Sequence, residues 1–156
     1  YAFASHFAPR MLLQAIELYR RNFRPSATLD KPYVIVGVPL VAAPSDAEAE
    51  FLASSNYQRV LGILTGRRVP LQRPVEGFMA SLPPHMQDAI HDFLAAAVIG
   101  SPETVRAGLS RIAELTQADE FIFVSDIYDL ELRLRSLDIA VQAHAEAFGQ
   151  PSAVAA

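Results

Sequence analysis

Apolar residues follow two alternating patterns along the chain. Runs rich in β-prone residues occupy positions 1–7, 33–43 and 121–124, the second of them interrupted by Gly37 and Pro39. Around these runs, apolar residues recur every three or four positions, which is typical of one buried face of an α-helix. Strands that alternate with helices pair in parallel through right-handed crossovers. The sequence therefore predicts an α/β fold in which three parallel strands are covered by helices.

Residues 98–129 show this pattern most completely. Ser101 is a favourable N-cap, and the proline after it suits the first helical position. Residues 121–124, FIFV, form the kind of run expected of a strand buried on both faces. This strand ends at Ser125 and Asp126, and ligands collect at the carboxyl ends of parallel strands. Both residues are therefore candidate cofactor contacts; the alternative is that the carboxylate only caps the last helix.

The same spacing predicts four further helices. One follows the first strand directly, and another ends near residue 97. A third begins at the capping box formed by Ser45 and Glu48, and Gly66 is expected to end it. The last helix is expected to be capped by Asp129. Its predicted packing stripe consists of Leu130, Leu134, Leu137 and Val141.

Prolines mark two irregular places. Because proline cannot donate to a β-ladder, regular pairing is expected to stop or bulge near Pro39. Residues 67–84 contain four prolines and are predicted to be an insertion, the least regular internal part of the chain. This insertion follows a helix expected to run away from the ligand mouth, and we predict that it contributes to a lid. Residues 150–156 are predicted to be a disordered tail.

Composition narrows the class of protein. The length of 156 residues, with 51% hydrophobic and 19% charged residues, favours a single globular domain. A formal net charge of −4 gives no basic footprint, so neither nucleic acid nor an anionic membrane is an expected partner. No apolar run approaches the roughly 20 residues that span a bilayer. The absence of cysteine excludes disulfides and thiolate chemistry and fits a cytoplasmic protein.

Three segments together resemble a known family. They are YAFASHFAP, LDKPYVIVGVPLVAA and GSPETVRAGLSRIAELTQADEFIFVSDIYD. Their order, with an insertion between the second and the third, is similar to the last three βα units of the bacterial luciferase-like flavin-dependent monooxygenases. The resemblance covers nearly the whole chain. It implies that residues 1–149 are the C-terminal part of a (βα)8 TIM barrel and contain its sixth, seventh and eighth strands.

The resemblance also implies a function and a set of partners. The family uses reduced FMN, supplied by a separate reductase, together with O2 and a small organic substrate; some relatives use a deazaflavin instead. The alternative is a non-enzymatic flavin-binding or structural homologue of the same fold. The chain begins at Tyr1, inside a predicted strand, so the natural N-terminus is expected to be missing. We therefore expect the missing N-terminal half of the barrel, or a second copy in a homo-oligomer, to cover the open strands.

His6 is the candidate catalytic residue. It follows the first predicted strand, where an imidazole could contact a flavin edge or transfer protons near neutral pH. The alternative is that it only satisfies a backbone carbonyl. Ser5 is a candidate cofactor contact, but neighbours on a strand face opposite ways, so a triad of Ser5, His6 and Asp126 is not expected. We predict that His6 and Asp126 lie on the same rim of the sheet.

Gly100 and Ser101 are candidate cofactor contacts of another kind. They open a helix whose free N–H groups could receive a phosphate; the alternative is a helix cap and nothing more. The remaining histidines, His85, His91 and His144, do not have the spacing of a helical zinc motif. No metal site is therefore predicted.

Overall fold

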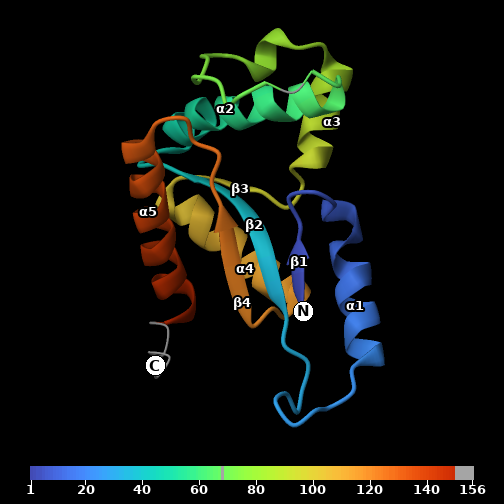
Figure 1. Cartoon of the computed structure of the whole chain (residues 1–156). Coiled ribbons are helices and arrows are strands. Elements are labelled where there is room, and N and C mark those ends of the chain that lie inside the picture. Colours follow the sequence, from blue (N-terminus) through green and yellow to red (C-terminus); the bar gives the residue numbers. More distant parts are fainter. Residues whose placement is uncertain (68, 150–156) are drawn as a thin grey trace.

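The computed structural model describes residues 1–67 and 69–149. In chain order the elements are β1 (Ala2–Ala4), the 3-10 helix η1 (Pro9–Met11), α1 (Leu12–Asn22), β2 (Ile35–Ala42), α2 (Asp46–Leu64), the 3-10 helix η2 (Met79–Ser81), α3 (Pro84–Phe93), β3 (Val98–Gly100), α4 (Pro102–Thr116), β4 (Glu120–Val124) and α5 (Leu130–Phe148). Figure 1 shows a central sheet with α1, α4 and α5 beside it and α2 and α3 above it. The predicted α/β fold is confirmed.

The three predicted strands form the sheet in the predicted direction. β2 is central and pairs in parallel with both β1 and β4. Ala4 lies opposite Gly37 on one edge, and Val124 lies opposite Pro39 on the other. All three carboxyl ends therefore meet at one rim, as they would for the last three strands of a (βα)8 barrel. The first strand is shorter than predicted, because a turn begins at Ser5.

A fourth strand, β3 (Val98–Gly100), pairs with β2 further along its length than β1 does. On any strand, the N–H groups of residues two apart point to the same edge. The Ile35 N–H donates to the Tyr1 carbonyl (2.8 Å), and the Ala43 N–H donates to the Gly100 carbonyl (3.1 Å). β1 and β3 thus lie one after the other along the same edge of β2. The prediction of only three strands was wrong, because β3 has three residues and leaves too little periodicity to detect.

This arrangement explains why Pro39 does not end β2. Pro39 directs its missing N–H toward the edge shared by β1 and β3. Pairing with β1 ends at Gly37, and pairing with β3 begins at Leu40. The proline therefore falls in the gap between two short partners, while the ladder with β4 uses the other edge. The strand itself continues to Ala42, but pairing with β1 ends at Gly37 and pairing with β4 ends at Pro39, so the predicted stop of regular pairing near Pro39 is confirmed for these two partners.

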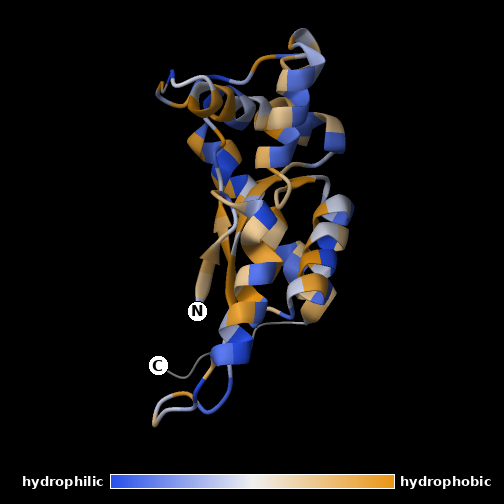
Figure 2. Ribbon diagram, turned by 90° about the vertical axis from the view of Figure 1, so that its right-hand side faces the viewer, coloured by the Kyte–Doolittle hydropathy of each residue, from blue (hydrophilic) through white to orange (hydrophobic). Residues whose placement is uncertain are grey.

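One face of the sheet packs against helices and forms the larger part of the core. Val36, Val38 and Leu40 alternate along β2 and are fully buried. They pack with Ile16 of α1 and Leu109 of α4 in one continuous cluster, to which α5 adds small residues. In Figure 2 the strands lie to one side of these helices. Because successive side chains on a strand face opposite ways, the other residues of β2 belong to the second face.

That second face is open at the two outer strands, although Gly37, Pro39 and Val41 of β2 on the same face are buried. Ile122 of β4 is the residue opposite Gly37, and its side chain is 50% exposed. On β1, Ala2 and Ala4 share this face and are also exposed. The prediction that β4 is buried on both faces was therefore wrong. Helices cover the run FIFV on one face only. Among the described residues, no comparable layer covers its other face.

α2 covers the carboxyl ends of the strands as a roof. Its Leu52, Ala53 and Val60 form a second core cluster with Val41 of β2 and Ile127, which follows β4. Figure 1 shows the helix lying across the top of the sheet. The expectation that this helix runs away from the rim was wrong. The N-cap half of the predicted capping box was right, since Ser45 Oγ accepts the Glu48 N–H (3.2 Å), whereas the Glu48 carboxylate pairs with Arg135.

α5 begins as predicted but turns a different face to the sheet. Asp129 Oδ1 accepts the Leu132 N–H (3.0 Å), which confirms the cap. The residues buried against the sheet are small: Ser136, Ala140 and Ala143. Most of the predicted packing stripe is instead on the surface, namely Leu130, Leu134 and Val141. Small residues let α5 approach β2 closely; Leu137 of the predicted stripe packs at the margin of the core, and the other three stripe residues face away from it.

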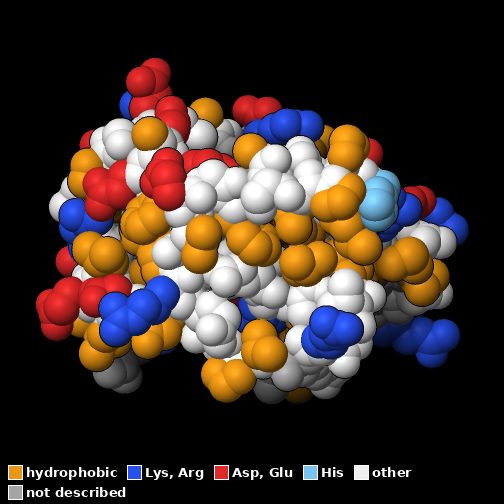
Figure 3. All heavy atoms as spheres, turned by 90° about the horizontal axis from the view of Figure 1, so that it is seen from above, with side chains coloured by type: hydrophobic (Ala, Val, Ile, Leu, Met, Phe, Trp, Pro, Cys, Tyr) orange, Lys and Arg blue, Asp and Glu red, His pale blue; other side chains and the backbone are white. Residues whose placement is uncertain are grey.

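The insertion lies along the roof helix. Between Arg67 and Pro83 its only regular element among the described residues is η2. The segment is anchored where the Gln58 amide donates to the Arg73 carbonyl (2.9 Å) and the Val75 N–H donates to Ser54 Oγ (2.8 Å). From above, hydrophobic side chains form a band between charged ones on this side of the molecule (Figure 3). The predicted tail, residues 150–156, lies outside the described residues.

Candidate functional site

Three polar residues meet at the carboxyl rim of the sheet. His6 follows β1, and Ser125 and Asp126 follow β4. Ala4 pairs with Gly37 and Val124 pairs with Pro39, so the residues that follow both strands lie at the same end of the sheet. The prediction that His6 and Asp126 share a rim is therefore confirmed. Parallel pairing through β2 brings these residues together although they are 120 positions apart.

The end of β1 is shaped by Ser5 and Gly37. The buried Ser5 hydroxyl donates to the Gly37 carbonyl. This bond takes the place of the next backbone hydrogen bond between β1 and β2. The Phe7 N–H donates to the Ala4 carbonyl (3.1 Å) and closes a turn. A Cβ at Gly37 would lie 3.5 Å from His6 Nδ1, an ordinary van der Waals contact, so the imidazole lies directly beside this position of β2. Ser5 is thus engaged with the backbone, and His6 projects over the rim.

Arg59 of α2 also enters this site and was not predicted from the sequence. Its Nη2 lies 2.9 Å from Asp126 Oδ2, in an ion pair whose side chains are 27% and 26% exposed. The same nitrogen donates to Asn56 Oδ1 (3.0 Å). An arginine inside a long helix gives no sequence signal of such a contact. Only the position of α2 over the strand ends reveals it.

The ion pair and burial together control the charge of His6. Burial lowers the pKa of the imidazole below its ordinary value of 6.5, and the positive charge of Arg59 lowers the pKa further. The Asp126 carboxylate acts in the opposite direction. His6 is therefore neutral at pH 7, with one nitrogen able to donate a proton and the other able to accept one.

Several polar atoms at this rim are buried without a protein partner. They include His6 Nδ1, Ser125 Oγ and Arg59 Nε. A buried polar group without a hydrogen bond costs about 1–3 kcal/mol, so native proteins pair nearly all of them with protein, water or ligand. His6 and Ser125 follow β1 and β4, and Arg59 belongs to α2, so the three atoms come from separate elements at the carboxyl end of the sheet. They offer hydrogen bonds to the polar edge of a bound molecule.

Gly100 and Ser101 form a different arrangement from the phosphate site considered above. Asp46 Oδ1 accepts the Ser101 N–H (2.7 Å). Hydrogen bonds from Ser101 and Thr104 lower the pKa of the Asp46 carboxyl. Ser101 Oγ accepts the Thr104 N–H (3.4 Å) as an N-cap. A carboxylate thus already occupies the position that a phosphate oxygen would take. The cap alternative accounts for these contacts.

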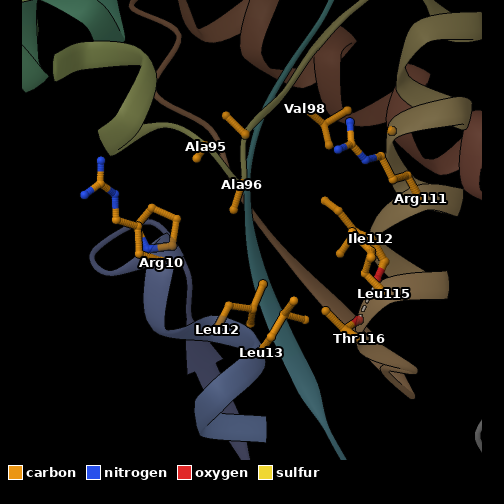
Figure 4. A pocket seen from close by; sticks show the side chains of 13 residues that line it. Arg10, Leu12, Leu13, Ala95, Ala96, Val98, Arg111, Ile112, Leu115 and Thr116 are labelled. Atoms are coloured by element: carbon orange, nitrogen blue, oxygen red, sulfur yellow. Dashed lines mark hydrogen bonds between the residues drawn. The ribbon is translucent and has the colours of Figure 1, made fainter. Parts of the chain in front are cut away.

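A groove in the helix layer has a lining that includes none of the rim residues His6, Arg59, Ser125 and Asp126. It has a volume of about 290 Å³ and lies between α1, the segment before β3, and α4. Figure 4 shows its mainly apolar lining, including Leu12, Ala96 and Ile112, with Arg10 and Arg111 at its margins. In the described part of the chain, no group of three His, Asp or Glu side chains could hold a metal ion. No described helix is long and apolar enough to cross a membrane.

The chain is similar to several curated proteins. It is 39% identical over 149 residues to a luciferase-like monooxygenase of Escherichia coli (strain K12), which covers 96% of this chain and 44% of the relative. It is also 39% identical over 139 residues to YvbT, an uncharacterized protein of Bacillus subtilis (strain 168), which covers 89% of this chain and 41% of that protein. The chain thus spans less than half the length of these relatives. No family model matches it.

Two solved structures are also similar to the chain. Apo-MsnO8 superposes with a TM-score of 0.79 at 29% identity, covering 92% of this chain and 44% of that one. The monooxygenase RslO1 from Streptomyces bottropensis superposes with a TM-score of 0.51 at 15% identity, over 94% of this chain and 40% of that one, which is a likeness of fold. Together with the order of the parallel strands, these similarities show that the chain belongs to the luciferase-like monooxygenase family.

Proposed function

We propose that the chain contributes to a luciferase-like flavin-dependent monooxygenase that oxygenates a small organic substrate with reduced FMN and O2. The observation that carries this proposal is the set of unpartnered polar atoms on His6 and Ser125 at the carboxyl rim. Such atoms fit the hydrogen-bonding edge of a flavin ring or of a substrate beside it. The chain covers less than half of its relatives, so the activity is proposed for the longer protein.

The fit to FMN is partial within this chain. The rim offers hydrogen bonds for a ring system, and the open face of small and apolar residues offers a surface for an aromatic plane. The Ser101 N–H, however, is bound to Asp46 and is not available to a phosphate. We therefore assign the phosphate contacts to the part of the protein outside this chain. FMN is favoured over a deazaflavin by the resemblance alone.

Each residue of the rim has a distinct task in this proposal. Reduced flavin, when bound, supplies the electrons with which oxygen is activated. α2 lies over the rim and limits the access of water, which protects reactive species from side reactions. Neutral His6 accepts or donates a proton at Nδ1, and the Ser125 hydroxyl orients the ligand. The insertion beside α2 is proposed to act with it as a lid.

The open face is proposed to receive the other half of a barrel. A hollow at the β4 edge is lined by Phe121, Val141 and His144, and a second at the β1 edge by Tyr1 and Leu18. In a closed barrel the neighbouring strands and helices fill these positions. We propose the N-terminal half of the same protein as the occupant because the relatives are more than twice as long. A second copy of the chain is the alternative.

The function is tested with the full-length natural protein and reduced FMN under anaerobic conditions. Wild-type protein is expected to bind reduced FMN, and His6→Gln is expected to weaken binding or slow turnover. On admission of oxygen, an oxygenase should reoxidise the flavin at a rate different from that of free flavin. Binding followed by reoxidation at the rate of free flavin favours the non-enzymatic alternative. Failure to bind reduced FMN at all overturns the proposal.

A further inference from the structure

The insertion meets the rest of the molecule at a junction of three segments. The Gln58 amide of α2 donates to the Arg73 carbonyl (2.9 Å), and the Val75 N–H donates to Ser54 Oγ of the same helix (2.8 Å). The Arg73 side chain extends elsewhere: its guanidinium lies over the ring of Tyr128, with Cζ 5.3 Å from the ring centroid. Arg73 thus joins the insertion both to α2 and to the loop that follows β4.

The loop after β4 is a firm support for this contact. Ile127, directly before Tyr128, is fully buried in the second core cluster, and its carbonyl accepts a hydrogen bond from Arg133 of α5 (2.9 Å). Asp129, directly after Tyr128, caps α5. The tyrosine ring therefore stands between two fixed positions of the backbone. A movement that parts the guanidinium from the ring must come from the insertion.

Residues 69–78 of the insertion, here called the strap, are held much less firmly. None of them is fully buried, and they contain no helix or strand. A segment with few buried contacts opens locally at a small cost in free energy. In such a segment, one cation–π contact at the surface changes the population of the open form by a factor of roughly two to five. The contact with Tyr128 is therefore strong enough to bias the strap and weak enough to be released.

The same loop presents the candidate ligand contacts. Asp126 pairs with Arg59 of α2 (2.9 Å), and the buried Ser125 Oγ has no protein partner. α2 is thus fastened to the loop at Asp126, and the strap is fastened to it two residues later, at Tyr128. The two attachments lie directly beside the hydroxyl that we assign to the ligand.

We propose that Arg73 fastens the strap to Tyr128, and that release of this contact opens a path for the ligand to the side of the rim where Ser125 and Asp126 lie. Arg73 and Tyr128 are positioning residues, because they act through the strap and the loop. The entry of the ligand rests on the proposed function. The fastening of the strap does not, since it is a property of the protein without ligand.

The test is hydrogen exchange of the full-length natural protein without flavin, followed by mass spectrometry in peptides that contain Val75. Arg73→Gln removes the charge and keeps the backbone carbonyl that binds Gln58. Tyr128→Leu removes the ring and keeps an apolar side chain. Each substitution is expected to speed exchange of the strap roughly two- to fivefold. Arg73→Lys and Tyr128→Phe keep the cation and the ring face, so both should stay close to wild type.

The double variant Arg73→Gln/Tyr128→Leu separates a direct contact from independent loosening. It should exchange no faster than either single variant, because the second substitution removes a contact that is already lost. Arg67→Gln is the matched control: it removes another exposed arginine, just before the strap, and should change nothing. Wild-type exchange in either single variant, multiplied effects in the double variant, or equal acceleration in peptides of α4 overturns the inference.

Binding of reduced FMN under anaerobic conditions tests the second part of the proposal. Tyr128→Leu is expected to bind and release reduced FMN roughly two- to fivefold faster than wild type with the same affinity, because the more frequent opening serves both directions. Unchanged binding rates in a variant whose strap exchanges faster overturn the role in ligand entry. A protein that binds no reduced FMN refutes the proposed function instead, and the fastening of the strap is then decided by exchange.

Discussion

The two faces of the same sheet differ sharply. On the helix side, Val36, Val38 and Leu40 are fully buried in a core shared with α1, α4 and α5. On the other side, Ile122 is half exposed, and the neighbouring alanines of β1 are open to solvent. Both faces are made of residues with little polarity. The difference therefore lies in what covers each face, and not in the chemistry of the strands.

An apolar face without a cover indicates a surface evolved for contact. Burying apolar area is worth about 25 cal/mol per Å², so a few hundred Å² amounts to several kcal/mol. A natural sequence that left such a face in water would forgo stabilisation comparable to the net stability of a domain. The two faces can be compared directly, because equivalent substitutions on each should have unequal effects on the isolated chain.

The largest effect is expected from truncation on the covered side. Leu109→Ala removes a fully buried side chain of α4 and should lower the free energy of unfolding by about 2–5 kcal/mol. Ile122→Ala on the open side should cost well under half of this in the monomer, because half of its side chain is already in water. Urea denaturation at low protein concentration measures both. Equal losses would mean that a partner covers the open face in solution.

The next effect concerns the hydroxyl that joins α5 to β2. Ser136 Oγ accepts the Ala42 N–H (2.8 Å) at the point where the ladder with β4 has ended, and both residues are fully buried. Ser136→Ala leaves this N–H without an acceptor and should cost about 1–3 kcal/mol. Hydrogen exchange of the Ala42 amide should become faster. Ser110→Ala, on a partly exposed face of α4, is the control and should be close to neutral.

A smaller effect is expected for association through the open face. Ile122→Lys places a charge where the apolar cover should dock and should weaken that contact roughly tenfold, about 1.4 kcal/mol. Sedimentation at several concentrations measures self-association of the chain, and a mixing experiment measures docking of the N-terminal half. Lys at Leu115, an exposed residue on α4, is the control. An effect of the same size from Leu115→Lys would indicate non-specific stickiness of the chain.

Much of the fold could be predicted from local signals. The caps at Ser45, Ser101 and Asp129 depend on neighbouring residues only, and all three appear as hydrogen bonds in the structure. The direction of the strands followed from alternation with helices. The face of α5 could not be predicted in this way. Small residues rather than leucines meet β2, because the close approach of the helix to the sheet was not visible in the sequence.

The candidate site was only partly predictable for a related reason. His6, Ser125 and Asp126 end strands, so a general rule about parallel sheets located them. Arg59 lies inside a helix whose place over the rim depends on long-range packing of Leu52 and Val60 against residues after β2 and β4. Spacing within one segment carries no information about that packing. The residues at the strand ends could therefore be predicted from the sequence, whereas the residue contributed by α2 could be found only in the structure.

The smallest predicted effect is the contribution of His6, at the rim, to the pH dependence of the stability of the chain. Its pKa in the folded protein is below the ordinary value of 6.5, so the unfolded chain takes up the proton first as the pH falls. The stabilisation is present above pH 6.5 and is lost as the pH falls from there toward the folded pKa. Asp46, whose pKa is lowered from 3.8, loses its contribution only in more acidic solution.

Urea denaturation of wild type and His6→Gln at pH 7.5 and pH 5.5 should therefore isolate the imidazole. Wild type is expected to lose more stability than the variant between these two pH values, by less than about 1 kcal/mol because the rim is partly solvated. Arg59→Gln should shrink the difference, since removal of the guanidinium brings the folded pKa closer to that of the unfolded chain. If the variant and wild type respond to acid identically, the imidazole at the rim is no more restricted in its ionisation than one in water. The charge pair under α2 would then have no influence on the chemistry of the strand ends.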